Sequence, residues 1–324
     1  MVAFVFVVGQ ALQLINLPIG LLATSLLIFA LAGLWLPAAL NLSPTAFTGL
    51  KRFAPGFVLL GLLLAVANFG FADFLMAVMQ HALEHVLPAK LTEMARETPR
   101  ILLGASHPAR IIIVLAAGVA APIGEELFFR GWLQGLLARR YSTFAAIFWT
   151  AVVFSLTHGD VVGFIPRVEL GLLFGFLRAS TGSIYPDIVA HATHNLVSLA
   201  LLFYSPNPVA ELNQPFRWRE VAPTGLGSLV ATLLVLWLLF HLAPRARAKE
   251  PEPLVPSMRE RPPFSLRVGV ALAGVILVPL LLLGTGAILQ HFERHLPGYG
   301  LVRDPFDHPT WAPPMPSRPG TAPP

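Results

Sequence analysis

Long apolar stretches separated by short polar segments run through most of the chain. A helix that crosses a bilayer needs about 20 predominantly apolar residues, and several stretches approach or exceed that length. We interpret as membrane spans residues 19–40, 55–80, 111–138, 142–158, 163–178, 184–204, 225–242 and 268–290. A shorter apolar run at residues 2–16 is either a separate helix or the first part of the span at 19–40. The pattern predicts an all-α fold, a polytopic transmembrane helical bundle of about eight spans.

Residues 82–108 have a different pattern. Leu83, Leu87 and Leu91 recur at helical spacing, with charged residues between them. A helix with one apolar and one charged face typically lies in the plane of the membrane interface. We therefore expect an interfacial helix here rather than a membrane span.

The composition agrees with a protein whose main solvent is lipid. Hydrophobic residues make up 55% of the 324 residues and charged residues only 12%, whereas soluble domains carry about 25% charged residues. Such a chain lacks the polar side chains that would cover a water-facing surface. We expect an integral membrane protein with the lipid bilayer as a partner. Residues 1–8 lack the basic start of a signal peptide, and we read them as part of the mature protein.

Basic residues cluster in the loops after alternate spans. They are Lys51, Arg52, Arg139, Arg140, Arg178, Arg245, Arg247 and Lys249. This is the positive-inside pattern, which places those loops in the cytoplasm. The net charge of +5 therefore reflects membrane topology rather than a nucleic-acid-binding surface, and we expect no nucleic-acid partner. Because the chain contains no cysteine, disulfides, thiolate catalysis and cysteine-ligated metals are excluded.

These patterns divide the chain into four regions. Residues 1–110 hold the N-terminal transmembrane segments and the interfacial helix, and residues 111–204 carry unusual polar side chains within apolar segments. Residues 205–290 hold two C-terminal spans joined by a basic, proline-rich linker that begins at Pro244. The proline-rich tail at 291–324 has the composition of a disordered segment.

The first cluster of unusual polar residues lies within the span at 111–138, where Glu125, Glu126 and Arg130 interrupt an apolar stretch. A charge near the bilayer centre costs about 2.5–3.5 kcal/mol, so these side chains must pair with one another or face water inside the bundle. Glu126 and Arg130 are four residues apart and share a helix face, which predicts an ion pair. Glu125 projects about 100° away from Glu126 and is left free for another role.

Two further segments place histidine and asparagine in apolar surroundings. His158 follows Phe154 by four residues at the end of the span at 142–158, and His191 precedes Asn195 by four residues within the span at 184–204. Each pair therefore shares one face of its helix. We expect three helices to turn these polar faces toward a single water-filled cavity.

A cavity with these side chains supports two hydrolytic mechanisms. In the first, Glu125 is a general base toward water, and histidine and asparagine side chains stabilise an oxyanion. In the second, Glu125, His158 and His191 bind a divalent metal such as zinc, which activates the water. The chain contains neither a G-x-S-x-G nor an H-E-x-x-H motif, so a serine-elbow or zincin mechanism has no support.

The three motifs in this order resemble the CPBP family, which includes CAAX prenyl endopeptidases and bacterial Abi-type membrane proteases linked to bacteriocin self-immunity. The resemblance extends over the region of residues 110–204. The matching residues are Glu125, Glu126, Arg130, His158, His191 and Asn195. The resemblance implies an intramembrane endopeptidase of the bacterial cytoplasmic membrane. Its substrate would be a membrane protein or a lipid-anchored peptide, with a CAAX-like substrate as one precedent.

The resemblance also implies roles for the individual residues. By analogy, Glu125 activates the attacking water and His158 helps to hold it, while His191 and Asn195 stabilise the oxyanion. The ion pair predicted in the first motif organises the site. The family has been described both as metal-dependent and as glutamate-dependent, so the resemblance allows either a divalent metal or no cofactor.

Two other functions stay open at this point. A non-catalytic membrane scaffold or bacteriocin-immunity protein could use the same fold, but it would have no need of His158, His191 and Asn195 together. A small-solute transporter also carries ionisable residues within the membrane. The sequence shows neither the internal repeats nor the paired broken helices of many transporters. We therefore rank the protease first.

Overall fold

A computed structural model describes residues 12–13, 16–51, 55–87, 89–208 and 216–247. Every regular element in this part of the chain is a helix, which confirms the all-α prediction. The predicted span at 268–290 and the tail at 291–324 lie outside the described residues, as does most of the apolar run at 2–16.

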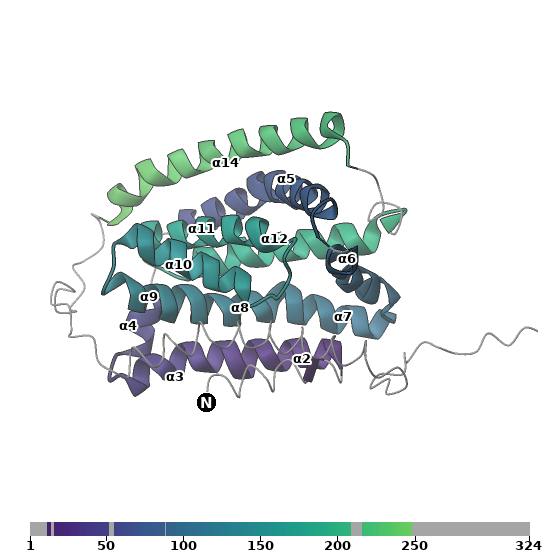
Figure 1. The fold of residues 1–324 in the computed structure, drawn as a ribbon. Helices are drawn as coiled ribbons and strands as arrows, with labels where there is room; N and C mark the ends of the chain where they lie inside the picture. Colours follow the sequence, from purple (N-terminus) through teal and green to yellow (C-terminus); the bar gives the residue numbers. More distant parts are fainter. Residues whose placement is uncertain (1–11, 14–15, 52–54, 88, 209–215, 248–324) are drawn as a thin grey trace, which may run out of the picture. The chain divides into compact units, whose positions relative to one another are not determined.

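The helices follow one another with short connections (Figure 1). Their bounds are α2 (Leu17–Ala23), η1 (Thr24–Ala30), α3 (Leu31–Ala39), α4 (Pro44–Thr48), α5 (Gly56–Glu84), α6 (Ala89–Gly104), α7 (His107–Leu115), η2 (Ala116–Ala120), α8 (Ala121–Glu126), η3 (Leu127–Leu133), α9 (Gln134–Ala138), α10 (Thr143–Leu156), α11 (Phe164–Thr181), α12 (Tyr185–Tyr204) and α14 (Trp218–Arg247). The elements labelled η are π-helical segments that follow the neighbouring α-helices without a break. The elements from α2 to α3 (residues 17–39) and from α7 to α9 (residues 107–138) therefore form two continuous helical rods. Wider turns of this kind often occur at functional sites.

Most predicted spans have a matching helix. The span at 111–138 is part of the rod from His107 to Ala138, and the spans at 142–158, 163–178 and 184–204 correspond to α10, α11 and α12. Two boundaries differ from the prediction. Helix α5 continues to Glu84, so the helix expected at 82–108 starts only at Ala89, and α14 runs through Pro244 to Arg247, where we expected a linker.

Within the residues that the structure describes, four helices are long and apolar enough to cross a membrane, so the predicted count of about eight spans is not confirmed. They are Leu17–Ala39, Gly56–Glu84, His107–Ala138 and Trp218–Ala243. Helix α10 is apolar but short, and α12 carries Asp187, His191 and Asn195 within its 20 residues. Polar side chains lower the hydropathy of a helix even where it is packed inside a bundle. The chain is an integral membrane protein by these long apolar helices.

Two buried clusters hold the helices together. The first joins the α2–α3 rod to the α7–α9 rod and α10, and is rich in aromatic side chains such as Phe29, Phe128, Trp132 and Phe154. The second joins α5 to α11, α12 and α14. Figure 1 shows the two rods side by side and α14 next to α5. The elements that carry the three motifs, α8–η3, α10 and α12, therefore pack within one bundle.

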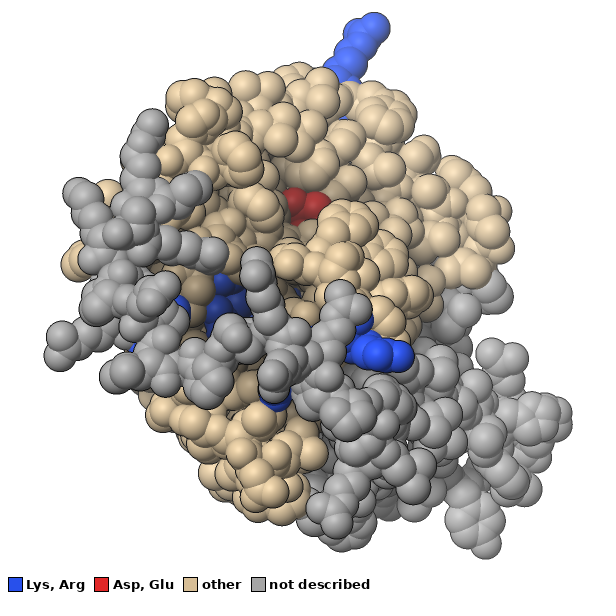
Figure 2. All heavy atoms as spheres, turned by 90° about the vertical axis from the view of Figure 1, so that its left-hand side faces the viewer, with Lys and Arg blue, Asp and Glu red and all other residues tan. Residues whose placement is uncertain are grey.

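Loops with basic residues gather at one end of this bundle. The Ser183 hydroxyl, in the loop after Arg178, donates to the backbone oxygen of Lys51 at 3.2 Å. The Arg139 guanidinium lies 5.8 Å from the centre of the Phe47 ring. Figure 2 shows exposed Lys and Arg side chains at this end. The common location agrees with loops on one side of a membrane, whereas their cytoplasmic orientation stays a prediction.

Gly124 permits a close approach between two rods at the first motif. A Cβ atom at this position would collide with the backbone oxygen of Ser25 in η1. The absence of a side chain therefore brings the α8 backbone directly against η1. As a result, Glu125 lies beside η1 rather than at a distance from it.

Candidate active site

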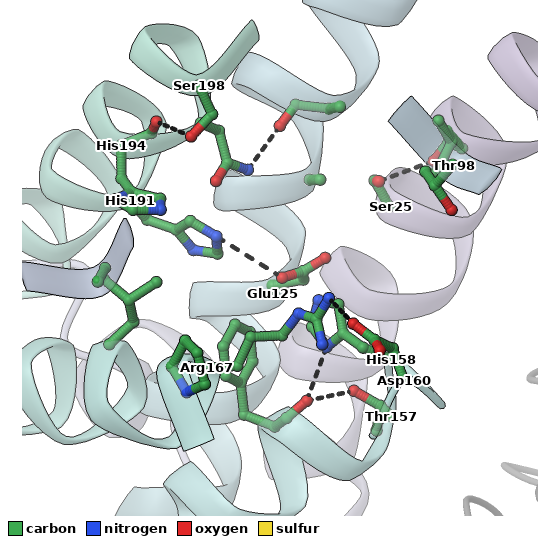
Figure 3. Close-up of a pocket in the computed structure, with 18 of the residues that line it drawn as sticks. Ser25, Thr98, Glu125, Thr157, His158, Asp160, Arg167, His191, His194 and Ser198 are labelled. Carbon is green, nitrogen blue, oxygen red and sulfur yellow. Dashed lines mark hydrogen bonds and ion pairs between the residues drawn. The ribbon is translucent and has the colours of Figure 1, made fainter. Parts of the chain in front are cut away.

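The three motifs meet at one cavity of about 730 Å³ between the helices (Figure 3). The motif residues that line it are Glu125, Phe154, His158, His191 and Asn195. Apolar side chains from α2, α5, α6 and α11 form much of the remaining wall. The structure thus brings together side chains from α8, α10 and α12 as the helical spacing predicted.

Glu126 and Arg130 form an ion pair beneath the cavity. Arg130 Nη1 lies 2.9 Å from Glu126 Oε1, and both side chains have no exposed surface. Arg130 Nη2 also approaches the backbone oxygen of Gly171 on α11, at 3.4 Å. The predicted pair is therefore present and buried. Such a pair is costly to break, because removal of one partner leaves the other charge unpaired in a low-dielectric interior.

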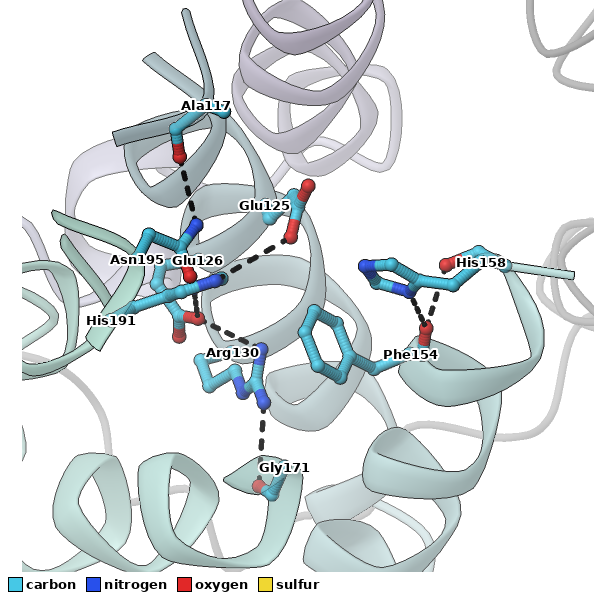
Figure 4. Close-up of polar contacts among 10 residues, drawn as sticks. Ala117, Glu125, Glu126, Arg130, Phe154, His158, Gly171, His191 and Asn195 are labelled. Carbon is cyan, nitrogen blue, oxygen red and sulfur yellow. Dashed lines mark hydrogen bonds and ion pairs between the residues drawn. The ribbon is translucent and has the colours of Figure 1, made fainter. Parts of the chain in front are cut away.

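The same carboxylate orients His191. His191 Nδ1 lies 2.8 Å from Glu126 Oε1 (Figure 4). An ionised carboxylate can only accept hydrogen bonds, so Nδ1 carries the proton and donates it. In the neutral imidazole, Nε2 then holds a lone pair. Nε2 lies 3.8 Å from Oε2 of Glu125, so the ring connects the buried ion pair with the cavity.

Glu125 differs from Glu126 in having no hydrogen-bond partner among the described residues, although its carboxylate lies near His191. Its carboxylate makes no hydrogen bond within the described part of the chain, and its side chain is 14% exposed toward the cavity. The 3.8 Å separation from His191 is too long for a direct hydrogen bond. Glu125 is thus the motif carboxylate that is free to bind water.

His158 faces Glu125 and His191 across the cavity (Figure 4). Its Nδ1 donates to the backbone oxygen of Phe154 at 2.9 Å, so Nε2 of the neutral ring is the hydrogen-bond acceptor. The ring is held against Phe154 with a centroid separation of 5.0 Å. The helix-end position at 158 therefore presents one unoccupied acceptor to the cavity.

Asn195 joins α12 to the η2 turn. Its Nδ2 donates to the backbone oxygen of Ala117 at 2.8 Å. An amide NH₂ group has two donors, so one N–H of Asn195 is still available to a ligand.

Aromatic rings enclose the charged groups. The Arg130 guanidinium lies 4.5 Å from the centre of the Phe154 ring and 5.3 Å from that of Phe174. Phe174 also stacks on His191, with centroids 5.0 Å apart. These faces exclude water from the ion pair and hold both cationic and imidazole groups in place.

The arrangement does not form an evident metal site. No three His, Asp or Glu side chains within the described ranges are grouped closely enough to hold a metal ion, and zinc needs three or four such ligands. Nδ1 of both His158 and His191 is engaged elsewhere, so only Nε2 of each ring could bind a metal. The metal mechanism therefore stays an expectation from the sequence and its family resemblance.

The cavity also contains polar residues that the sequence analysis did not select. Asp160 and Arg167 form an ion pair of 2.8 Å in its wall, and Asp73, His194 and Ser198 line it as well. The sequence does show that Asp160 and Arg167 are charged residues next to apolar segments. Their position in the cavity depends on the conformation of the loop between α10 and α11, which the sequence pattern does not give.

Comparisons with known proteins agree with this geometry. Residues 107–197 match the family described as type II CAAX prenyl endopeptidase Rce1-like. Over 84 residues the chain is 30% identical to the protein of Bacillus subtilis (strain 168) named "Putative membrane peptidase YdiL". The aligned residues make up 26% of this chain and 34% of that relative. No solved structure matches the chain.

The matched region contains all three motifs, with α8, α10 and most of α12. The match spans about a third of the length of the curated relative, so it identifies the core rather than the whole chain. The central segment of this membrane protein, residues 107–197, is therefore similar to the Rce1-like CAAX prenyl endopeptidases and to a relative named as a membrane peptidase.

Proposed function

We propose that the protein is an intramembrane endopeptidase that hydrolyses a peptide bond of a membrane protein or a lipid-anchored peptide in the bacterial cytoplasmic membrane. The observation that carries this proposal is the free carboxylate of Glu125 in a cavity that also holds His158, His191 and Asn195. A CAAX-like sequence is one candidate substrate, by analogy with the name of the matching family.

The proposed reaction begins with a water molecule held between Glu125 and His158. Both groups present acceptors to the cavity, Glu125 through its carboxylate and His158 through Nε2. Glu125 takes a proton from the water, and the water oxygen adds to the carbonyl carbon of the substrate. The protonated Glu125 then gives this proton to the leaving nitrogen, which breaks the carbon–nitrogen bond. The reaction therefore consumes only water and the peptide, and Glu125 returns to its ionised form.

The buried partners of the site keep its geometry rather than react. Glu126 holds Nδ1 of His191 and is itself held by Arg130. This arrangement fixes the imidazole in one orientation beside Glu125. Preorganised groups of this kind avoid rearrangement at the moment of reaction.

Cleavage of a membrane-presented peptide by the purified full chain tests the proposal. Glu125→Gln keeps the side-chain volume but removes the base, so we expect normal thermal stability and a loss of at least about 100-fold in turnover. Glu220→Gln is the matched control, because that carboxylate is 56% exposed on α14 and lies outside the cavity. Wild-type activity in Glu125→Gln would contradict the proposed role of this residue.

The same assay with a chelator separates the two mechanisms. We expect activity to persist in the chelator, because Glu125 can activate water without a metal. Loss of activity that returns on addition of zinc would instead favour a metal site at Glu125, His158 and His191. A wild-type chain that cleaves no membrane peptide under either condition would favour the non-catalytic scaffold or the transporter.

A further inference from the structure

The donors expected for the oxyanion are partly engaged elsewhere. In its neutral form, His191 uses its only N–H on Glu126 and presents a lone pair at Nε2. Asn195 uses one of its two N–H groups on Ala117. A single neutral N–H is thus left from this pair, whereas oxyanion sites usually combine several donors or a charge. Another cavity side chain has unused donors.

Arg167 is that side chain. It lies on the first turns of α11 and lines the same cavity as Glu125 and His158 (Figure 3). Its charge is close enough to act on both of those residues. Arginine carries five N–H donors, and the hydrogen bond of its guanidinium in the described structure is from Nη2 to Asp160, at 2.8 Å. Nη1 is buried and has no hydrogen-bond partner.

The loop between α10 and α11 holds this guanidinium rigidly. Asp160 accepts hydrogen bonds from the backbone N–H groups of Val162 and Gly163, at 3.0 and 3.1 Å, in addition to that from Arg167. A Cβ atom at Gly163 would collide with the guanidinium, so the glycine provides the space that it occupies. Part of the negative charge of Asp160 is therefore engaged by backbone dipoles, and the position of Arg167 is fixed before substrate arrives.

We propose that Arg167 is a further catalytic residue, the cation that stabilises the oxyanion during peptide hydrolysis. The inference rests on the proposed protease function. When water adds to the carbonyl carbon and Glu125 takes the proton, the carbonyl oxygen receives the electron pair of the former double bond. Arg167 and the spare N–H of Asn195 stabilise that negative oxygen. The electron pair returns to carbon when the leaving nitrogen departs with the proton from Glu125.

The test uses two peptide analogues that differ in charge at the reacting centre. One replaces the scissile amide by a phosphinate, which is tetrahedral and anionic, and the other by a neutral hydroxyethylene group. Both are assayed with the full chain in the presence of a chelator, so that metal binding by the phosphinate does not contribute. We expect the wild type to bind the phosphinate more tightly than the neutral analogue.

Arg167→Gln should lower kcat by about 100-fold or more, the usual effect of losing an oxyanion donor, with KM changed by only a few-fold. Its affinity for the phosphinate should fall by a similar factor, and its affinity for the neutral analogue should change little. Arg167→Lys keeps the charge and should retain part of the preference for the phosphinate. If Arg167→Gln does not fold, a folded Arg167→Lys variant that has lost this preference entirely still overturns the proposal.

Asp160→Asn is the matched control for a purely structural role. It removes the charged partner and weakens the loop but leaves the arginine, so it should retain the preference for the phosphinate. Equal losses in Asp160→Asn and Arg167→Gln, with both analogues weakened alike, would show that Arg167 only holds the loop. The proposed function is judged separately. Cleavage by the wild type but not by Glu125→Gln supports the protease even if Arg167→Gln behaves like the wild type, which would overturn the role of Arg167 alone.

Discussion

His191 Nδ1 and Glu126 Oε1 are 2.8 Å apart, although the two residues are 65 positions apart in the sequence. The contact connects α12 to the end of α8 in the interior of the bundle. The same oxygen, Oε1, also accepts a hydrogen bond from Arg130 Nη1 at 2.9 Å. The stability of the core and the orientation of the imidazole are therefore linked through one carboxylate.

The first prediction concerns the stability of this linked group. Arg130→Ala removes the partner of a carboxylate that has no exposed surface, so we expect the free energy of unfolding to fall by about 3–5 kcal/mol. The measurement is thermal unfolding in detergent. Arg217→Ala is the control, because Arg217 and Glu220 form a pair with side chains that are 64% and 56% exposed, and such pairs contribute little. Equal stability of the two variants would indicate that Arg130 is hydrated rather than buried.

The second prediction concerns the contact between α8 and η1. Gly124→Ala introduces a Cβ that collides with the backbone oxygen of Ser25, so the two rods must separate. Overpacking of this kind typically costs about 1–3 kcal/mol, and the displacement should also lower turnover because Glu125 is the next residue. Stability and peptide cleavage are measured together.

Gly227→Ala is the matched control for that substitution. A Cβ at Gly227, within α14, has no heavy atom within 4 Å. Replacing a helical glycine by alanine without a clash should leave stability unchanged or raise it by up to about 1 kcal/mol. A Gly124→Ala variant as stable and active as Gly227→Ala would contradict the close approach of the rods.

The sequence predicted contacts within a helix better than contacts between helices. The Glu126–Arg130 pair follows from spacing of four residues on a continuous helix, which is local geometry. The sequence does not predict the hydrogen bond from His191 to Glu126, because helical spacing gives no information on where α12 packs. The ion pair of Asp160 with Arg167 likewise depends on the conformation of the α10–α11 loop. The motifs did indicate that their helices would converge, because buried polar groups need one another.

Two of the predicted spans that are not confirmed are interrupted by polar side chains. The spans at 163–178 and 184–204 contain Arg167 and Glu169 in one case and His191 and Asn195 in the other. These side chains reduce the hydropathy of helices that are nevertheless packed inside the bundle. Residues of the candidate site thus lower the hydropathy of the helices that carry them.

The third prediction concerns topology. Lys51 and the loop after Arg178 touch through the hydroxyl of Ser183, so both should lie on the same side of the membrane. Reporter fusions after Arg52 and after Arg247 should both report the cytoplasm. A fusion after Tyr204, at the other end of α12, should report the opposite side. Different locations for Arg52 and Arg247 would mean an odd error in the number of spans between them.

The last prediction concerns Asn195, whose amide has both a structural and a proposed catalytic contact. Its bond to the Ala117 oxygen is 2.8 Å long, and loss of one such hydrogen bond typically costs about 1 kcal/mol. Loss of an oxyanion donor lowers turnover by about 100-fold or more, so Asn195→Ala should reduce kcat far more than stability. Ser198→Ala is the control, because this serine lines the cavity and its hydroxyl is engaged with the backbone oxygen of His194 at 2.9 Å. It should retain turnover within a few-fold of the wild type. If Asn195→Ala lost no more turnover than Ser198→Ala, the amide would serve only to join α12 to η2, and the negative oxygen would depend on other donors.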